Sequence, residues 1–475
     1  MGDQAAGIRS RLQRPLAVPR IYLGLGVVYV LVRILAIAGT AAVGAFPDSA
    51  TYRQGAGEPV YRFVSLTGHA MRPWVPPLLF ANLPSDSARA GAQVLISIGA
   101  WLVLATTVAL ALRDRRVRMA AFVVILALSC TTAVTSWDRI IGAESTSISF
   151  AVLALAAWIR FAKKPTGLNS VAVVLAMIFW SFTKSGMFPV VGLAAAIVLF
   201  TMINRRDRAL RGAVAVALIL VALWGLAANS RSDTAYEAYN DQGLSQFSGN
   251  FATLLRLQIL TDRSDTAWFV HHGMPDPKGL LAYKRPTVLD DTWTTGEQPF
   301  LSAYLARRDL THWVNTRGRS VYSQFIVTHP GEIGSRFVRD LRYMVVPTRR
   351  FLIYDRAPRE VMPAVVRNLL FDTSSGPGLP RAIYGDVGLL VVACLVLVFV
   401  PRRRARDARL LLVAGATFLL SMAAILLGWL FSPIEIVRHA IPATIVLRLA
   451  LWLTVFALLD AILNGQERIE PASIE

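Results

Sequence analysis

The sequence predicts an all-α polytopic membrane protein with about ten transmembrane helices, and two observations lead to this fold class. Of the 475 residues, 55% are hydrophobic and only 17% are charged, and the mean hydropathy is +0.50. A soluble domain carries about a quarter charged residues. The apolar residues also lie in long runs, and a helix of about 18 such residues crosses a ~30 Å hydrocarbon core. Because no water reaches the backbone there, each run is expected to be helical.

The apolar runs give the order of the predicted helices. The first run, from Ile21 to Phe46, carries Arg33 within it. It is longer than the apolar region of a signal peptide, which has about 7–15 residues, so we expect it to remain as the first span. The predicted spans are 21–44, 93–112, 118–136, 144–162, 168–183, 187–204, 212–230, 384–400, 409–431 and 438–463.

Basic residues predict the orientation of these spans. Clusters of Arg and Lys precede the first span and follow the second, fourth, sixth and eighth, so ten spans place every cluster on one side. The alternate short loops carry one basic residue each, namely Arg139, Lys184 and Arg438. Since cytoplasmic loops are rich in Lys and Arg, we expect a multi-pass protein of the inner (plasma) membrane with both termini in the cytoplasm.

Two segments lie outside the predicted spans. One is the loop 45–92, and the other is a stretch of about 150 residues that is long enough to be a domain. Runs within the longer segment, at 248–260, 299–314 and 329–345, have a helical pattern. Three domains are predicted: residues 1–230 with seven helices and the first outer loop, an extracytoplasmic, mainly helical domain 231–384, and residues 385–475 with three helices.

Composition also excludes several classes of function. The net charge is +19, but the basic residues lie in short loops between apolar runs, so we expect no nucleic-acid partner. Cys130 and Cys394 both lie in apolar runs without metal-ligand spacing, which argues against a disulfide and a cysteine metal site. Glycine-rich nucleotide-binding signatures are absent from the sequence.

Ionisable residues gather at the predicted outer ends of the spans, where such groups are functional candidates. Glu144 heads an apolar run, so a solvated surface does not explain it. Local pairing explains some of the others equally well, for example an ion pair between Asp138 and Arg139, or a cap formed by residues at i, i+3 and i+4. The whole set is Asp48, Asp138, Arg139, Glu144, Lys184, Glu435, Arg438 and His439.

These residue types suit an enzyme that acts on a lipid-linked sugar phosphate. Such an enzyme needs a carboxylate that deprotonates an incoming hydroxyl and cations that hold the departing phosphate. Asp48 is the candidate base. Lys and Arg suit the second task because they form charge-assisted hydrogen bonds with phosphate oxygens.

Four segments resemble the GT-C superfamily of polyprenol-phosphate-sugar-dependent glycosyltransferases, such as the protein O-mannosyltransferases and the aminoarabinose transferase. FPDSATY (46–52) resembles the catalytic segment after the first span, and GHAMRPWVPPLLFANLP (68–84) resembles the Pro-rich juxtamembrane segment. WDRIIGAESTSISFAVLALA (137–156) is similar to the pattern in which a Glu opens the fourth span. EIVRHAIPA (435–443) resembles a late outer loop, with His439 where Tyr often stands.

This resemblance implies a GT-C-like architecture and transfer of a hexosyl or pentosyl group from a polyprenyl-phosphate donor. The acceptor would be an extracytoplasmic glycan, lipid or protein, as in cell wall biosynthesis, and Asp48 would be the general base. No metal ligand and no other cofactor are assigned. A divalent metal stays open, although the segment FPDSATY has one Asp instead of an acidic pair, which argues against metal assistance. The residues implied to bind the donor phosphate are Arg139, Lys184, Arg438 and His439. The residues assigned supporting or acceptor-binding roles are Tyr52, Arg72, Asp138, Glu144, Glu435, His271 and His272.

Two other readings remain open. A polysaccharide polymerase or ligase of the O-antigen type also has one large outer loop, and would use His and Arg residues there, such as His271 and His272 in WFVHHGMPDP (268–277). A turn stabilised by packed imidazoles explains this stretch as well. A transporter of lipid-linked glycans would show repeats and charges near the middle of the membrane, which this sequence has little of.

Overall fold

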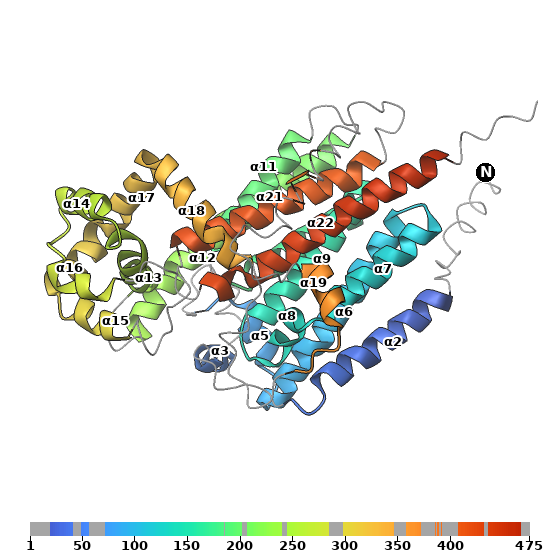
Figure 1. Cartoon of the computed structure of the whole chain (residues 1–475), viewed down its shortest axis with the longest axis horizontal. Coiled ribbons are helices and arrows are strands. Elements are labelled where there is room, and N and C mark those ends of the chain that lie inside the picture. The colour runs from blue at the N-terminus through green and yellow to red at the C-terminus, as the bar shows by residue number, and fades with distance from the viewer. Residues whose placement is uncertain are drawn as a thin grey trace, which may run out of the picture.

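The computed structural model describes residues 20–40, 49–56, 72–184, 186–201, 207–239, 245–284, 298–345, 358–371, 385, 387, 388, 391, 407–431 and 436–466. Every regular element within these ranges is a helix. Figure 1 shows long helices that form one bundle and shorter helices that gather at one end of it. The described part of the chain therefore has the all-α architecture of a helical membrane protein, as predicted.

Six helices are long and apolar enough to cross a membrane, and a seventh span results if two helices bent by 47° at residues 130–131 count as one. Two predicted spans, 168–183 and 187–204, form shorter apolar helices of 15 and 13 residues. A 15-residue helix measures only about 22 Å, which is less than the hydrocarbon core. The number of long helices is thus lower than the ten spans predicted, and span 384–400 lies almost entirely outside the described residues.

Some of the bundle helices have first turns that are capped by short polar side chains. The hydroxyl of Ser85 accepts from the backbone N–H of Ala88, and the Asp114 carboxylate accepts from two N–H groups of the next helix. The bundle helices are α2 (Arg20–Ile37), α6 (Asp86–Ala111), α7 (Arg115–Ser129), α8 (Thr132–Thr135), α9 (Glu144–Lys163), α10 (Gly167–Ser181), α11 (Phe188–Phe200), α12 (Arg208–Tyr239), α21 (Asp407–Phe431) and α22 (Ile436–Gln466).

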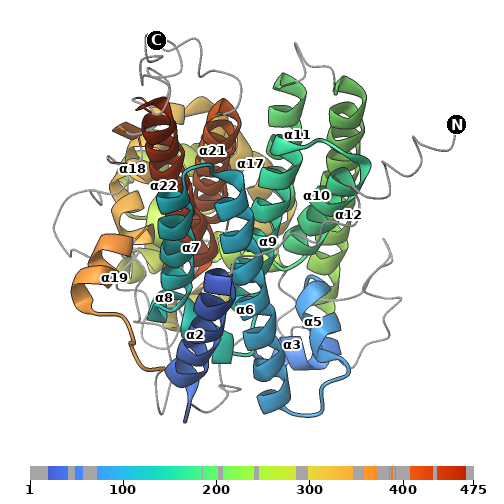
Figure 2. The same ribbon diagram turned by 90° about the vertical axis from the view of Figure 1, so that its right-hand side faces the viewer.

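Helix α9 lies at the centre of the bundle and packs against α6, α10, α21 and α22 (Figure 2). Among the six long apolar helices it has the largest buried share, 72%. Helix α2 lies at the periphery with a buried share of 17%, and it exposes Leu23, Val27, Leu31 and Leu35. Exposed leucines and valines on a helix of this length are expected to face lipid. A residue at the start of α9 is therefore enclosed by several helices.

The shorter helices form a subdomain that we call the α13–α18 subdomain. Its core contains Phe251, Trp313 and Tyr322, and each buried aromatic ring contributes about 1.5–3 kcal/mol. The Tyr322 hydroxyl donates to the Leu430 carbonyl at 2.9 Å, which fixes the subdomain to the end of α21. Its elements are α13 (Gln246–Leu254), the π-helix η2 (Leu255–Ile259), α14 (Arg263–His271), η3 (Lys278–Tyr283), α15 (Gln298–Leu305), α16 (Arg308–Trp313), the π-helix η5 (Val314–Gly318), α17 (Arg319–Thr328) and α18 (Pro330–Met344).

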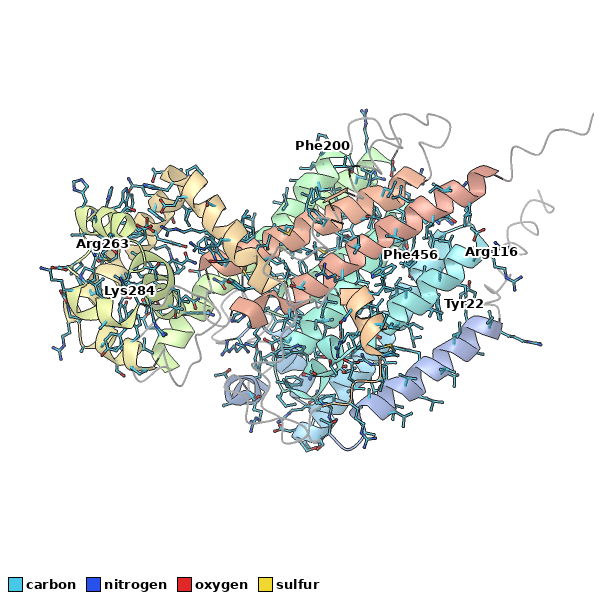
Figure 3. All side chains as sticks on the ribbon, in the orientation of Figure 1. Tyr22, Arg116, Phe200, Arg263, Lys284 and Phe456 are labelled. Atoms are coloured by element: carbon cyan, nitrogen blue, oxygen red, sulfur yellow. The ribbon has the colours of Figure 1, made fainter. Side chains whose placement is uncertain are left out.

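Two of the three helical runs predicted in this region are continuous helical segments in the structure. Runs 248–260 and 329–345 are confirmed as α13 with η2 and as α18, whereas run 299–314 is interrupted at residues 306–307. In Figure 3, Arg263 and Lys284 mark the subdomain, and Arg116 lies at the opposite end of the bundle. Three further short helices are α3 (Ser49–Ala56), α5 (Val75–Phe80) and α19 (Ala364–Phe371).

Candidate functional site

Three of the predicted site residues meet at the first turn of α9. Glu144 is 3% exposed, and one of its carboxylate oxygens, Oε1, lies 3.5 Å from Lys184 Nζ and 3.3 Å from Arg438 Nη1. Lys184 follows α10, and Arg438 lies in the first turn of α22. The fold therefore brings two cations from distant parts of the chain to one buried carboxylate. We call Glu144, Lys184 and Arg438 the Glu144 cluster.

The backbone before α9 makes room for this carboxylate. A Cβ atom at Gly142 would lie 2.9 Å from Glu144 Oε2, so glycine is the residue that leaves the oxygen its space. Glu144 also stands in the first turn of its helix, where the positive end of the helix dipole favours an anion. Both features hold the carboxylate near the two cations.

Beneath the cluster lies a second buried ion pair that was not predicted. Asp138 forms it with Arg33 of α2, and both side chains are 1% exposed. Asp138 Oδ1 accepts from the Ser145 hydroxyl at 2.6 Å, and Arg33 donates to the Ser97 hydroxyl at 2.8 Å. The network connects α2, α6 and the start of α9. It therefore fixes the residue that follows Glu144.

This pairing corrects the reading in which Asp138 pairs locally with Arg139. Arg139 Nη2 instead donates to the Thr40 carbonyl oxygen at 2.8 Å. Consecutive side chains on a helical turn point in different directions, so a contact with a neighbouring helix wins over the sequential one. Arg139 thus contacts the end of the first span, while Lys184 and Arg438 contact Glu144. An arginine within an apolar run, which needs a buried partner, was the signal for Arg33.

The predicted catalytic residue Asp48 and the supporting residue Glu435 lie outside the described residues. The segment next to Asp48 is described. The Ser49 hydroxyl donates to the Ile141 carbonyl at 2.7 Å, three residues before Glu144. Tyr52 is buried against Ile141 and Phe80. Helix α3 therefore packs on the turn that leads into α9.

Arg72 supports the same helix from the other side. Its Nε donates to the Thr51 hydroxyl at 2.9 Å, and its guanidinium carbon lies 5.3 Å from the centre of the Tyr52 ring. Tyr52 and Arg72 were assigned supporting roles, and in the structure both hold α3 in its place.

A cavity begins beside the Glu144 cluster and has an empty volume of about 690 Å³, including its open side. Lys184 and His439 line it together with Ser147. Ser147 lies near the start of α9, and the apolar wall extends along the same helix to Trp158, a rise of about 16 Å. The remaining wall is mostly apolar and comes from α10, α21 and α22, with Met177, Trp180, Leu420, Ala424, Pro442 and Val446 among its residues. A polar end and a long apolar wall suit an amphiphile with a charged head.

His271 and His272 belong to a different part of the molecule. Both are on or next to α14, which Figure 1 places in the α13–α18 subdomain, on the side away from the bundle. The His272 ring stacks on Trp268 with ring centres 3.7 Å apart, and its Nδ1 lies 2.7 Å from the Trp268 carbonyl oxygen. The structure thus places His272 in a packed aromatic cluster and does not bring it to Glu144.

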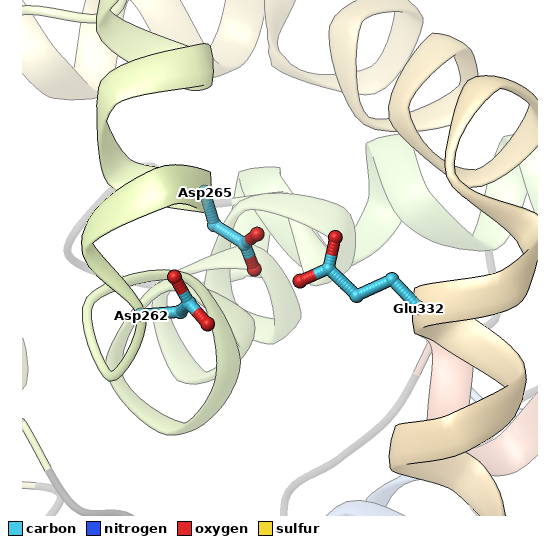
Figure 4. Close-up of side chains that lie close together, drawn as sticks. All are labelled: Asp262, Asp265 and Glu332. Atoms are coloured by element: carbon cyan, nitrogen blue, oxygen red, sulfur yellow. The ribbon is translucent and has the colours of Figure 1, made fainter.

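Three carboxylates also gather in the subdomain, with ligand oxygens within 4.8 Å of one another (Figure 4). They belong to Asp262, Asp265 and Glu332, and Arg336 pairs with all three. A guanidinium therefore supplies the positive charge that a metal ion would bring. Burial raises the pKa of Asp265 to about 6, although the adjacent Arg336 opposes part of this rise. We call these four residues the Arg336 cluster.

Comparison with known proteins adds a distant structural likeness. No protein-family model matches the sequence, and no curated protein matches it. Among solved structures, the chain is similar to the archaeal oligosaccharyltransferase AglB from Archaeoglobus fulgidus, in complex with an inhibitory peptide and a dolichol-phosphate, with a TM-score of 0.41 and 13% identity. The match covers 96% of this chain and 52% of that one, so the chain spans about half the length of that protein. A likeness at this level identifies neither the family nor the activity of the chain.

Proposed function

We propose that the protein is a membrane glycosyltransferase of the GT-C type that moves a sugar from a polyprenyl-phosphate donor to an extracytoplasmic acceptor of the cell envelope. The observation that supports this proposal is the Glu144 cluster beside the apolar cavity. The cluster supplies cations for a phosphate, and the cavity supplies an apolar surface for a lipid chain. One amphiphilic donor satisfies both.

The charges of the cluster fit the donor. Lys184 and Arg438 carry two positive charges against the single negative charge of Glu144. The donor is a phosphodiester with one negative charge, so it neutralises the surplus. When the bond between the sugar and the phosphate breaks, a second negative charge develops on the phosphate oxygen. Cations that are already in place stabilise this charge more than the ground state, which lowers the barrier.

In the proposed reaction the acceptor hydroxyl attacks the anomeric carbon, and the bond from that carbon to the phosphate oxygen breaks. Asp48 accepts the proton of the hydroxyl, and polyprenyl phosphate leaves with the bonding electron pair. Ser49, the residue after Asp48 in the sequence, contacts the turn before Glu144 through the Ile141 carbonyl, and this contact supports the choice of Asp48 as the base. Lys184, which lines the cavity, is proposed as the main contact of the phosphate, with Arg438, His439 and Arg139 as further contacts.

The first test is sugar transfer from labelled polyprenyl-phosphate donors, one hexosyl and one pentosyl, by purified protein supplied with membrane extract as acceptor. Transfer is expected for the wild type and is expected to collapse in Asp48→Asn. The variant should keep the wild-type thermal stability, which shows that it is folded. Wild-type activity in Asp48→Asn would remove the assigned base, and failure to consume any donor would refute the glycosyltransferase proposal.

The same assay separates the polymerase alternative. That reading requires essential histidines in the α13–α18 subdomain, so His271→Ala and His272→Ala would abolish activity. A glycosyltransferase with Asp48 as its base should keep most of its transfer activity in His271→Ala. The His271 side chain is exposed and lies on α14, in the α13–α18 subdomain and not in the Glu144 cluster.

A further inference from the structure

A second pocket is lined by residues of α12, α13, η5 and α17. Figure 1 shows α12 next to the α13–α18 subdomain. Its empty volume is about 1090 Å³, including its open side. All but one of the lining side chains are polar, and the exception is Phe247. The lining includes Glu237, Phe247, Asn315, Thr316, Arg319 and Ser320.

One wall of this pocket is a π-helical turn. Asn315 and Thr316 lie in η5, where the backbone bonds shift from i+4 to i+5. Such turns change the direction of side chains and occur often at functional sites. Here the turn is enclosed between α16 and α17, both regular helices. It places Asn315 and Thr316 in the lining of the pocket, while the Thr316 hydroxyl donates to the His312 carbonyl at 2.8 Å.

A buried hydroxyl orients the Asn315 amide. Ser248 is fully buried, and its hydroxyl donates to Asn315 Oδ1. The Ser248 hydroxyl lies 2.9 Å from that of Ser245, which caps α13. Because the amide oxygen is occupied by Ser248, the NH₂ group is the part of Asn315 that serves as a donor to a ligand. A hydrogen-bond donor is thus held in place from behind.

The described lining also carries one cation, one anion and one aromatic ring, and the cation, Arg319, lies one turn after Asn315 on the helix that continues from η5. The guanidinium carbon of Arg319 lies 4.8 Å from the centre of the Phe247 ring, a cation–π contact that restricts the arginine. Glu237 contributes a carboxylate from α12. Among the lining residues that the structure describes, one positive and one negative charge leave no net charge. An anionic ligand would meet Glu237, whereas a neutral ligand rich in hydroxyl groups can donate to Glu237 and accept from Asn315 and Arg319.

We propose that this pocket binds an uncharged glycan. If the protein has the function proposed above, this glycan is a segment of the sugar acceptor. The subdomain holds the segment while its terminal hydroxyl reaches the Glu144 cluster. The class of acceptor is then a neutral polysaccharide or its precursor, and not a protein.

The test is binding of defined neutral oligosaccharides to the purified full-length protein in nanodiscs, without any donor. A panel of mannan, galactan and arabinan tetrasaccharides serves as the probe, with a uronic-acid tetrasaccharide as the anionic comparison. Saturation-transfer difference NMR with competition gives the affinity. At least one neutral tetrasaccharide should bind the wild type, and its affinity should fall at least tenfold in Asn315→Leu and in Arg319→Ala. Gln324→Ala is the matched control, because Gln324 is an exposed polar residue of the same helix that does not line the pocket.

The outcomes are distinct from those of the transfer assay. Binding that depends on Asn315 and Arg319 supports the glycan site even if the protein consumes no polyprenyl-phosphate donor, in which case only the acceptor role fails. Absence of binding by every tetrasaccharide overturns the proposal. So does binding restricted to uronic-acid oligosaccharides, which would contradict the charge argument, or equal loss of affinity in Gln324→Ala.

Discussion

The Glu144 cluster and the Arg336 cluster are built from the same ionic groups in opposite proportions. The first has two cations for one carboxylate, from three distant segments, beside a cavity with apolar walls. The second has one cation for three carboxylates, and two of its members are a turn apart on α18. A surplus of positive charge at a cavity provides for an anionic ligand. A surplus of carboxylates around a guanidinium holds two helices together and makes that contact depend on pH.

The largest expected difference concerns the removal of one buried arginine. Arg33→Met leaves Asp138 buried without its cation and is expected to cost about 3–5 kcal/mol of the free energy of unfolding. Arg336→Met should cost less, about 1–2 kcal/mol. The side chains of Asp262 and Glu332 are 41% and 33% exposed and keep water as a partner, and Asp265, although 2% exposed, has a raised pKa and can take up a proton when the cation is lost. Titration with SDS in mixed micelles measures both values. Equal costs would show that burial does not distinguish the two regions.

The second prediction removes the carboxylate of the Glu144 cluster. Glu144→Gln raises the local positive charge, so the product polyprenyl phosphate should bind about tenfold more tightly, which corresponds to about 1.4 kcal/mol. Product inhibition of the transfer reaction measures this affinity. Asp86→Asn is a suitable control because Asp86 is a partly exposed acid whose ion pairs are with Arg53 and Arg89. Weaker product binding in Glu144→Gln would mean that Glu144 positions the cations more than it opposes the phosphate.

The smallest expected effect is the pH dependence of the Arg336 cluster. The folded pKa of Asp265, about 6, lies above its ordinary value of about 3.9, so the folded state holds more protons between these two pH values. Its contribution to stability therefore falls as the pH rises from about 4 to about 6 and is constant above that window. About two pKa units correspond to about 2.8 kcal/mol. Because Asp262 and Glu332 are partly exposed and water screens these charges, the expected change is about 1 kcal/mol.

Asp265→Asn should remove this fall in stability, while Asp276→Asn, at an exposed site in the same subdomain, should keep it. The unfolding midpoints of the three proteins at pH 4.5 and 7 provide the comparison. A fall of the same size in all three would assign the pH dependence to other groups.

The sequence was informative where a charged residue interrupts or heads an apolar run. Glu144 was chosen on that basis, and Lys184 and Arg438 were chosen as ionisable residues at the predicted outer ends of the spans. The structure brings the three together. Asp138 was chosen as well, but its partner is Arg33, because helix packing decides which cation reaches a buried carboxylate. The apolar runs 168–183 and 187–204 were predicted to be full spans, but they form helices that are too short to cross a membrane alone. Hydropathy indicates which residues avoid water and does not give the length of a helix. The pocket at η5 could not be predicted, because a π-helical turn depends on packing and not on a residue pattern.

The most direct test of the central claim is the affinity of the protein for a radiolabelled short-chain polyprenyl phosphate in nanodiscs. The claim is that the cations of the Glu144 cluster hold the phosphate of a lipid that occupies the adjacent cavity. Lys184→Met is expected to weaken binding at least tenfold, and Lys164→Met, at an exposed lysine after α9, should bind as the wild type does. Equal affinities of the Lys184→Met variant and the wild type would contradict the claim, whatever activity the protein has.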